Sequence, residues 1–423
     1  MRRLFYRCQV PLARVILFSL GLGLLGSSPT NAQQTQEEVK GAPAEPADAQ
    51  ETRQEIAAIE KLRGSLPDRG AALYLLAVDK QHLHETREAL SALKGCLALR
   101  EGFDPSGSPS FLEFKDSKEF GTLIETVHRD YPVVAQAREA FRTTEKDLVP
   151  EGLAFDEQRG VFYLSSLHRK KIVQIARDGT VTDFVPAESF ALLPVLGIRV
   201  NPSDGTIWAN SFADAGRTEL LHFDGAGKLL GRYKPHDSVK HGFNDLVVRK
   251  NGEVITTDSL AGMVLRFHPA NESFEPLTVH RQLFYPNGIA LADDDRTLYV
   301  ADSLGVVRVD LSSSASRDVD PGAHSTLAGI DGLYWHKGSL VAVQNGIGSP
   351  RVVAFRLSND GLHITKTTVL ENRTNFTVLP TTGAIRGDDF YFIANSQIDN
   401  LNDDKVMDVT RLEPIRIGVV KLP

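Results

Sequence analysis

Four oxygen-bearing side chains occupy the same position in four sequence repeats. Glu151, Asn244, Asn287 and Asp331 each belong to a short polar pair within an apolar stretch, and the pairs read Glu-Gly, Asn-Asp, Asn-Gly and Asp-Gly. Two carboxylates and two amide carbonyls offer only oxygen, and their two negative charges balance a divalent cation. Such a set suits Ca²⁺, Mg²⁺ or Mn²⁺ better than Zn²⁺, which favours nitrogen and sulfur. The four residues therefore predict a metal site, provided that the repeats meet at one point.

The elements that must position these residues are repeats of roughly 45 residues, which recur six times from Glu151 onward. Each repeat begins with a short apolar strand that carries the pair and continues through a turn into a second strand, as in LADDDRTLYVADS. The other two repeats carry Leu196-Gly197 and Thr382-Gly383 at this position. This period predicts a six-bladed β-propeller, a mainly β fold in which equivalent positions surround one axis. We expect the ring to close through a blade shared between the two chain ends, because this removes exposed sheet edges.

Each pair taken alone is typical of a turn or a cap. Their shared position in four repeats favours a common site over four unrelated turns. A cation held by four protein oxygens keeps positions open for water and substrate, polarises a carbonyl and lowers the pKa of bound water. A carboxylate beside that water can act as a general base.

The residues before the repeats form three segments of different composition. Residues 1–32 resemble a secretory signal peptide, because several arginines precede a short apolar run and the small-residue site Thr30-Asn31-Ala32; an uncleaved membrane anchor is the alternative. Residues 33–50 are rich in Gln, Glu, Ala and Pro, which predicts a disordered linker. Residues 51–146 show helical spacing and resemble tetratricopeptide-type helix pairs. The predicted propeller then covers residues 147–423.

Composition narrows the functional classes. The chain has 423 residues, 42% of them hydrophobic and 24% charged, which suits one large and one small domain. Its net charge of −7, without a basic stripe, argues against a nucleic-acid partner. Cys8 lies in the predicted signal and leaves Cys96 alone, so we expect no internal disulfide. The chain has no Gly-x-Ser-x-Gly elbow and no phosphate-binding Gly-Lys-Ser/Thr loop, so nucleophilic serine and nucleotide chemistry lack support.

From about Val149 to the end, the chain resembles the gluconolactonase and regucalcin (senescence marker protein) family of six-bladed propellers. The resemblance rests on EGLAFDEQRGVFYLSS, FNDLVVRKNGEVITTDS, PNGIALADDDRTLYVADS and IDGLYWHKGSLVAVQNG. It implies that the central metal is surrounded by Glu151, Asn244, Asn287 and Asp331. It also implies that Asp331 acts on the attacking water while Glu151 anchors the cation. Ca²⁺ is the first candidate, followed by Mg²⁺, Mn²⁺ and Zn²⁺.

The resulting hypothesis is a periplasmic or secreted, metal-dependent hydrolase of a lactone, a sugar-acid derivative or a similar ester. It has no stable membrane insertion after signal cleavage. The alternatives are a non-catalytic propeller scaffold and a ligand-binding protein with a structural metal, in which the helical segment binds a protein partner. Arg199, Arg217 and His241 are candidates for binding substrate, although exposed surface positions explain them more simply. A shared strand-end position links Asp258, Asp302 and Asn395, and favours turn caps over a second ion site.

Overall fold

The computed structural model describes residues 47–176, 178–213, 216–402 and 405–423. The predicted signal peptide, residues 1–32, and residues 33–46 of the predicted linker lie outside the described residues. Helix α2 (Ala47–Leu62) begins within the segment predicted to be a disordered linker. The linker prediction is therefore wrong for residues 47–50, because Ala, Gln and Glu are strong helix formers as well as common linker residues. No described helix has the length and apolar character needed to cross a membrane.

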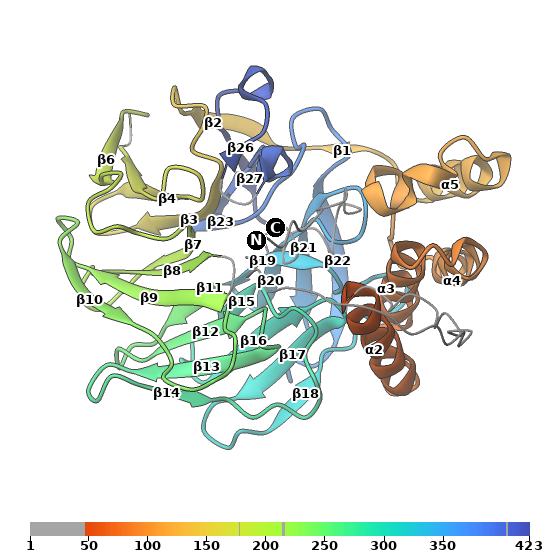
Figure 1. Cartoon of the computed structure of the whole chain (residues 1–423), viewed down its shortest axis with the longest axis horizontal. Coiled ribbons are helices and arrows are strands. Elements are labelled where there is room, and N and C mark those ends of the chain that lie inside the picture. The colour runs from red at the N-terminus through yellow and green to blue at the C-terminus, as the bar shows by residue number, and fades with distance from the viewer. Residues whose placement is uncertain (1–46, 177, 214–215, 403–404) are drawn as a thin grey trace, which may run out of the picture.

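Within the described residues, six sheets of at least four antiparallel strands form the six blades of a β-propeller (Figure 1). The first three blades consist of β3 (Pro150–Asp156), β4 (Val161–Ser166), β5 (Ile172–Ile175) and β6 (Val181–Val185); β7 (Val195–Val200), β8 (Ile207–Ala213), β9 (Arg217–Phe223) and β10 (Leu229–Tyr233); and β11 (Phe243–Val248), β12 (Val254–Asp258), β13 (Met263–His268) and β14 (Ser273–Pro276). The fourth and fifth consist of β15 (Ile289–Leu291), β16 (Thr297–Asp302), β17 (Gly305–Asp310) and β18 (Ser316–Asp318); and β19 (Ile330–His336), β20 (Ser339–Gln344), β21 (Arg351–Leu357) and β22 (Ile364–Asn372). The predicted fold class is confirmed.

The sixth blade closes the ring, because it combines three strands from the C-terminal end of the chain with one strand that precedes the first blade. It consists of β23 (Gly383–Arg386), β24 (Asp389–Ile393), β27 (Arg416–Lys421) and, as the outer strand, β2 (Arg138–Arg142). Strand β2 pairs with β27, and Arg138 lies opposite Val419. The first strands of successive blades contact one another around the ring, and β23 contacts β3. The predicted shared blade is thus confirmed, and it is the sixth.

Two strands correct the predicted domain boundary at residue 146. Strand β2 belongs to the sixth blade, and β1 (Val134–Ala135) adds a fifth strand beside β22. The helices end with α5 (Lys118–Asp130), shortly before Pro132, which cannot donate a backbone hydrogen bond to a continuing helix. The prediction that the helical segment extends to residue 146 is therefore wrong.

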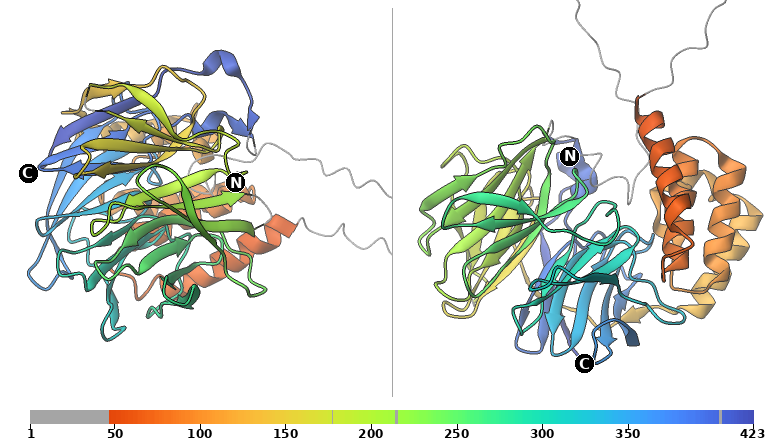
Figure 2. Two further views of the ribbon diagram at one scale, coloured as in Figure 1. Left: turned by 90° about the vertical axis from the view of Figure 1, so that its left-hand side faces the viewer. Right: turned by 90° about the horizontal axis from the view of Figure 1, so that it is seen from below.

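The helical segment packs on the face of the propeller where the first strand of each blade begins. It consists of α2, α3 (Arg69–His82), α4 (Thr86–Ala98) and α5, with 3₁₀ turns η1 (Pro105–Gly107) and η2 (Pro109–Phe114). Its apolar core includes Phe284 and Ala328, which lie in loops leading into β15 and β19. Asp68 caps α3 by accepting from Ala71 N, and its other oxygen accepts from Leu327 N at 2.9 Å. Figures 1 and 2 show the helices beside the propeller, and their tetratricopeptide-like character stays a prediction.

A smaller insertion follows β24. It consists of η4 (Ile398–Asn400), the hairpin strands β25 (Leu401–Asn402) and β26 (Lys405–Val406), and η5 (Val409–Arg411). Ile398 and Leu401 pack with Leu196, the residue at the ring position of the second blade. The second blade thus contributes an apolar residue beside the axis where four other blades contribute oxygen.

The polar pairs lie where the first strands of neighbouring blades come close to one another. A Cβ added to Gly152 would lie 2.3 Å from the carbonyl oxygen of Leu196, and one on Gly288 would lie 2.7 Å from that of Asp331. Cβ atoms do not approach a carbonyl oxygen so closely, so glycine allows these blades to pack side by side. Each Xaa-Gly pair therefore combines a side chain at the axis with a residue that permits the close approach.

We expect Gly152→Ala to lower the free energy of unfolding by about 1–3 kcal/mol, because the added methyl overlaps backbone that cannot move freely. Urea unfolding followed by tryptophan fluorescence measures this change, since Trp208 and Trp335 both lie in the propeller. Gly121→Ala in α5 is the matched control, because a Cβ there meets nothing within 4 Å. Equal stability of Gly152→Ala and the wild type would contradict this packing argument.

Candidate metal centre

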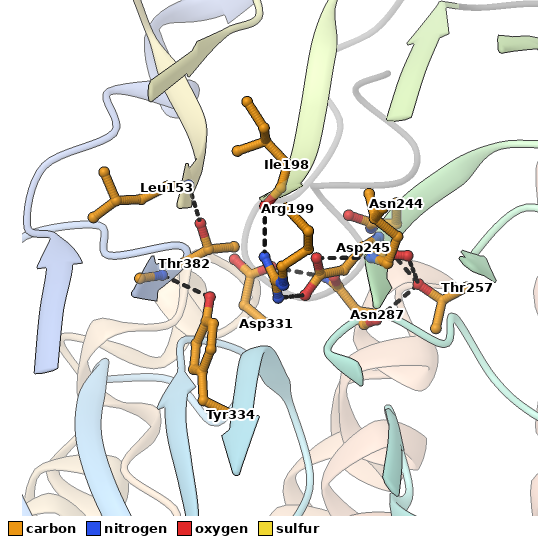
Figure 3. A network of polar contacts seen from close by, with 12 residues as sticks. Leu153, Ile198, Arg199, Asn244, Asp245, Thr257, Asn287, Asp331, Tyr334 and Thr382 are labelled. Atoms are coloured by element: carbon orange, nitrogen blue, oxygen red, sulfur yellow. Dashed lines mark hydrogen bonds and ion pairs between the residues drawn. The ribbon is translucent and has the colours of Figure 1, made fainter. Parts of the chain in front are cut away.

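The structure brings the four predicted ring residues together at the axis. Glu151, Asn244 and Asp331 lie near the starts of β3, β11 and β19, and Asn287 lies just before β15. Figure 3 shows Asn244, Asn287 and Asp331 gathered in one network. The Nδ2 atom of Asn287 donates to Asp331 Oδ1 at 2.8 Å. The two amides and Asp331 line a single cavity of about 50 Å³, which has room for an ion and a few waters.

Hydrogen bonding fixes how the two amides are turned. Ser259 Oγ donates to Pro286 O and must therefore accept from Asn244 Nδ2, which lies 3.0 Å away. When ionised, as a cation ligand would be, the Asp331 carboxylate can only accept, so the Asn287 nitrogen faces it. Both amides consequently direct their nitrogen atoms into the protein network and keep Oδ1 for another partner.

Three oxygens of the ring are buried acceptors without a hydrogen-bond partner among the described residues. They are Glu151 Oε2, Asn244 Oδ1 and Asn287 Oδ1. A buried acceptor without a partner costs about 1–3 kcal/mol, more when it is charged. Three such atoms on neighbouring residues fit a hard cation, whose preferred ligands are carboxylate and amide oxygens. The donor set thus fits the predicted divalent metal.

Burial dominates the electrostatics of the two carboxylates. It raises the pKa of Glu151 well above the ordinary value, and the charges of Asp331 and Asp245 raise it further. Burial also raises the pKa of Asp331 to about 7, although hydrogen bonds from Asn345 and Asn287 oppose the shift. A bound cation would favour both ionised forms and bring both pKa values down.

A partly buried ion pair that the sequence interpretation missed adjoins the ring. Asp245 replaces the glycine of the third blade's pair, and its Oδ2 lies 2.8 Å from Arg199 Nη2. The Arg199 guanidinium also lies over the Tyr334 ring, 5.1 Å from its centroid. Arg199 lies on β7, which contacts β11 of the next blade, where Asp245 lies. The sequence indicates this pair: Asp245 occupies the position at which the neighbouring repeats have glycine, and Arg199 lies on the first strand of the preceding repeat.

Asn345 is a second missed residue. Its Nδ2 donates to Asp331 Oδ2 at 2.5 Å and to the carbonyl oxygen of Pro380 at 2.9 Å. Since Asn287 donates to Oδ1, the two amides hold the Asp331 carboxylate from both sides. Asn345 follows β20 directly, in a turn whose sequence gives no sign of contact with the ring.

The structure corrects two of the three substrate-binding candidates. Arg199 and His241 are not exposed surface groups, since Arg199 pairs with Asp245 and His241 is buried against Asp258. Their partners exist only in the folded chain, so the sequence alone could not identify them. Arg217 is exposed at the start of β9.

Asp258 and Asp302 cap the turns that follow their strands, as expected, because they accept from the backbone N–H groups of Ala261 and Leu304. All three strand-end residues also accept from segments that are distant in the sequence. Asp258 Oδ1 accepts from the backbone N–H of Gly242, and Asp302 Oδ2 accepts from that of Phe284. Asn395 Oδ1 likewise accepts from the backbone N–H of Arg416. In the described part of the chain, no group of three or more His, Cys, Asp or Glu residues is placed to hold a metal. The ring differs from such a group because two of its four donors are asparagines.

No family model matches the chain, and no curated protein matches it. Among solved structures, a gluconolactonase from Xanthomonas campestris aligns with 18% identity and a TM-score of 0.46, over 65% of this chain and 86% of the other. A virginiamycin B lyase from Staphylococcus aureus aligns with 16% identity and a TM-score of 0.47, over 68% and 99%. An aldose sugar dehydrogenase from Streptomyces coelicolor aligns with 16% identity and a TM-score of 0.46, over 68% and 97%. Similarities this low do not assign an activity, and these three proteins are named for different reactions.

Glu151→Gln should stabilise the metal-free protein at pH 8 by about 1–3 kcal/mol, because it removes a buried charge. A carboxyl whose folded pKa is raised stabilises the protein at low pH and loses that contribution as pH rises through the folded pKa. The difference between variant and wild type should therefore shrink on acidification from pH 8 to pH 5, because protonation of the wild-type carboxyl removes the buried charge. Urea unfolding in chelator at both pH values measures it.

The control for this prediction is Glu157→Gln in the exposed turn of the same blade, which should follow the wild-type pH profile. A stabilisation by Glu151→Gln that grows on acidification would contradict the assigned burial of charge.

Proposed function

We propose that the protein is an exported hydrolase that uses a divalent cation to open a lactone or cleave a similar ester. The observation that carries this proposal is the set of three buried oxygens without a hydrogen-bond partner among the described residues, on Glu151, Asn244 and Asn287. Asn244 and Asn287 line the same cavity as Asp331. The composition of residues 1–32 supports export. Ca²⁺ is the cation that we favour for an all-oxygen set, ahead of Mg²⁺ and Mn²⁺, with Zn²⁺ least suited.

Glu151, Asn244, Asn287 and Asp331 would hold the cation. When bound, the cation supplies Lewis-acid polarisation of the substrate carbonyl and lowers the pKa of an adjacent water. Glu151 is buried, and its Oε2 has no hydrogen-bond donor in the described part of the chain. It would therefore anchor the cation. Arg199 pairs directly with Asp245 and with neither Glu151 nor Asp331, so two negative charges are left to match a divalent cation.

Asp331 is the residue that would move the proton. Asn287 and Asn345 fix its carboxylate in one orientation while each oxygen keeps a further lone pair. In the reaction, the water oxygen bonds to the carbonyl carbon and Asp331 accepts the proton that the water releases. The ester C–O bond then breaks, and Asp331 returns that proton to the departing alkoxide oxygen. The product is a hydroxy acid, or an acid and an alcohol.

Asp331→Ala should lower turnover of a responsive lactone by at least about 10²-fold, because it removes both the base and a cation ligand. Initial rates of acid release at constant pH measure the effect, with circular dichroism to confirm folding. Asp178→Ala, in an exposed turn of the first blade, is the matched control and should keep the wild-type rate.

Turnover by Asp331→Ala at the control rate would contradict the role of Asp331. Tight cation binding by the wild type without hydrolysis of any lactone or ester would favour the alternative, a non-catalytic propeller with a structural metal. A protein partner of the helical segment stays a separate proposal.

A further inference from the structure

Residues 326–331 lead from the fourth blade into β19 and end at the ring residue Asp331. The fifth blade holds them on one side. Gln344, at the end of β20, donates from Nε2 to the carbonyl oxygen of Thr326 at 3.1 Å. The next residue, Asn345, donates to the Asp331 carboxylate. Two consecutive residues of the fifth blade thus contact both ends of this connection.

The helical segment holds the same connection from another side, through Asp68. This residue is 1% exposed, and its Oδ2 accepts from Thr326 Oγ1 at 2.8 Å and from Leu327 N at 2.9 Å. Thr326 Oγ1 in turn accepts from Ala328 N at 3.0 Å. Thr326 and Leu327 have no exposed surface, so both donors would be left buried and unpaired without the Asp68 carboxylate.

The Asp68 carboxylate is suited to hold these donors firmly. Burial raises its pKa to about 6, although the hydrogen bonds from Thr326 and Leu327 oppose the shift. At pH 8 the group is therefore ionised, and its hydrogen bonds are charge-assisted and stronger than those between neutral groups. Its other oxygen, Oδ1, accepts from Ala71 N at the start of α3. One carboxylate thus joins α3 to the connection that ends at Asp331.

Apolar contacts link the helical segment to a second ring residue. Phe284 is buried in the apolar core of the helical segment, and Tyr285 packs against this core. Asn287 follows Tyr285 by two positions. The helical segment therefore contacts the residues that lead to two of the four ring positions, those of Asn287 and Asp331.

We infer that Asp68 is a positioning residue of the metal centre, because it holds residues 326–331 so that the Asp331 carboxylate lies at the ring. This inference rests on the cation site of the proposed function and not on hydrolysis. It gives the helical segment a role in the propeller's own site, which is distinct from binding a separate protein partner. Loss of the link should weaken cation binding at least about fivefold, the lower end of the usual range for coupled sites.

The test is calorimetric titration of Ca²⁺ into the chelator-stripped protein at pH 8. Asp68→Ser keeps a side chain that caps α3 but lacks the second oxygen that reaches Thr326 and Leu327. It should bind Ca²⁺ at least about fivefold more weakly than the wild type. Thr326→Val removes only the donated hydroxyl and should also weaken binding, whereas Thr326→Ser keeps the hydroxyl and should bind as the wild type does. These two variants carry the comparison if Asp68→Ser does not fold.

The matched control is Ser117→Ala, which removes a helix cap elsewhere in the helical segment. Ser117 Oγ accepts from Phe120 N at the start of α5. This variant should lose stability and keep the wild-type Ca²⁺ affinity, so it separates positioning from a general weakening of the helices.

Hydrogen exchange in chelator is the second readout, and it does not depend on a cation. Backbone N–H groups of residues 326–333 should exchange faster in Asp68→Ser than in the wild type or Ser117→Ala. Strand β13, on the third blade, should exchange alike in all three proteins.

The outcomes separate this inference from the proposed function. Equal Ca²⁺ affinity in the wild type, Asp68→Ser and Thr326→Val would overturn the role of Asp68 and leave the cation site standing. No Ca²⁺ binding by the wild type, with faster exchange of residues 326–333 in Asp68→Ser, would overturn the cation site and support the link from Asp68 to these residues. No binding and unchanged exchange would overturn both.

Discussion

The close approach of the first strands at the propeller axis is the constraint on which the rest of the structure depends. Gly152, Gly197 and Gly288 each lie so near the backbone of the next blade that a Cβ would overlap a carbonyl oxygen. Hydroxyl groups reinforce these contacts, since Thr382 Oγ1 donates to Glu151 O and Thr257 Oγ1 donates to Asn287 O. This packing places the preceding residue of each pair at the axis and removes it from water.

Buried charge is the consequence of that packing. Glu151 and Asp331 both have raised pKa values, and the first cause in each case is burial. The neighbouring Asp245 is offset by Arg199, so the remaining excess of negative charge concentrates on the two ring carboxylates. An isolated buried carboxylate is unfavourable unless it is paired, protonated or bound to a metal. A divalent cation would turn this unfavourable arrangement into a binding site.

The sequence predicts the ring well because a fixed repeat places equivalent residues at equivalent positions, whatever the details of each blade. It does not predict contacts that depend on how a turn folds back or on one residue that departs from the repeat. Asp245 breaks the glycine pattern and finds Arg199 on the neighbouring strand, while Asn345 reaches Asp331 from a turn. Strand β1 has two residues, too few to show a period of two, and its pairing with β22 depends on the helical segment returning the chain to the fifth blade.

The central claim is that oxygens of several blades bind one divalent cation, and calorimetric titration of Ca²⁺, Mn²⁺ and Zn²⁺ into the chelator-stripped protein tests it most directly. The informative variant is Asn244→Leu, which gives the third blade the residue that the second blade carries at Leu196. We predict one site per chain in the wild type and affinity at least about tenfold weaker in the variant, since one of four protein ligands is lost. Absence of binding to the wild type, or equal affinity in both proteins, would contradict the account.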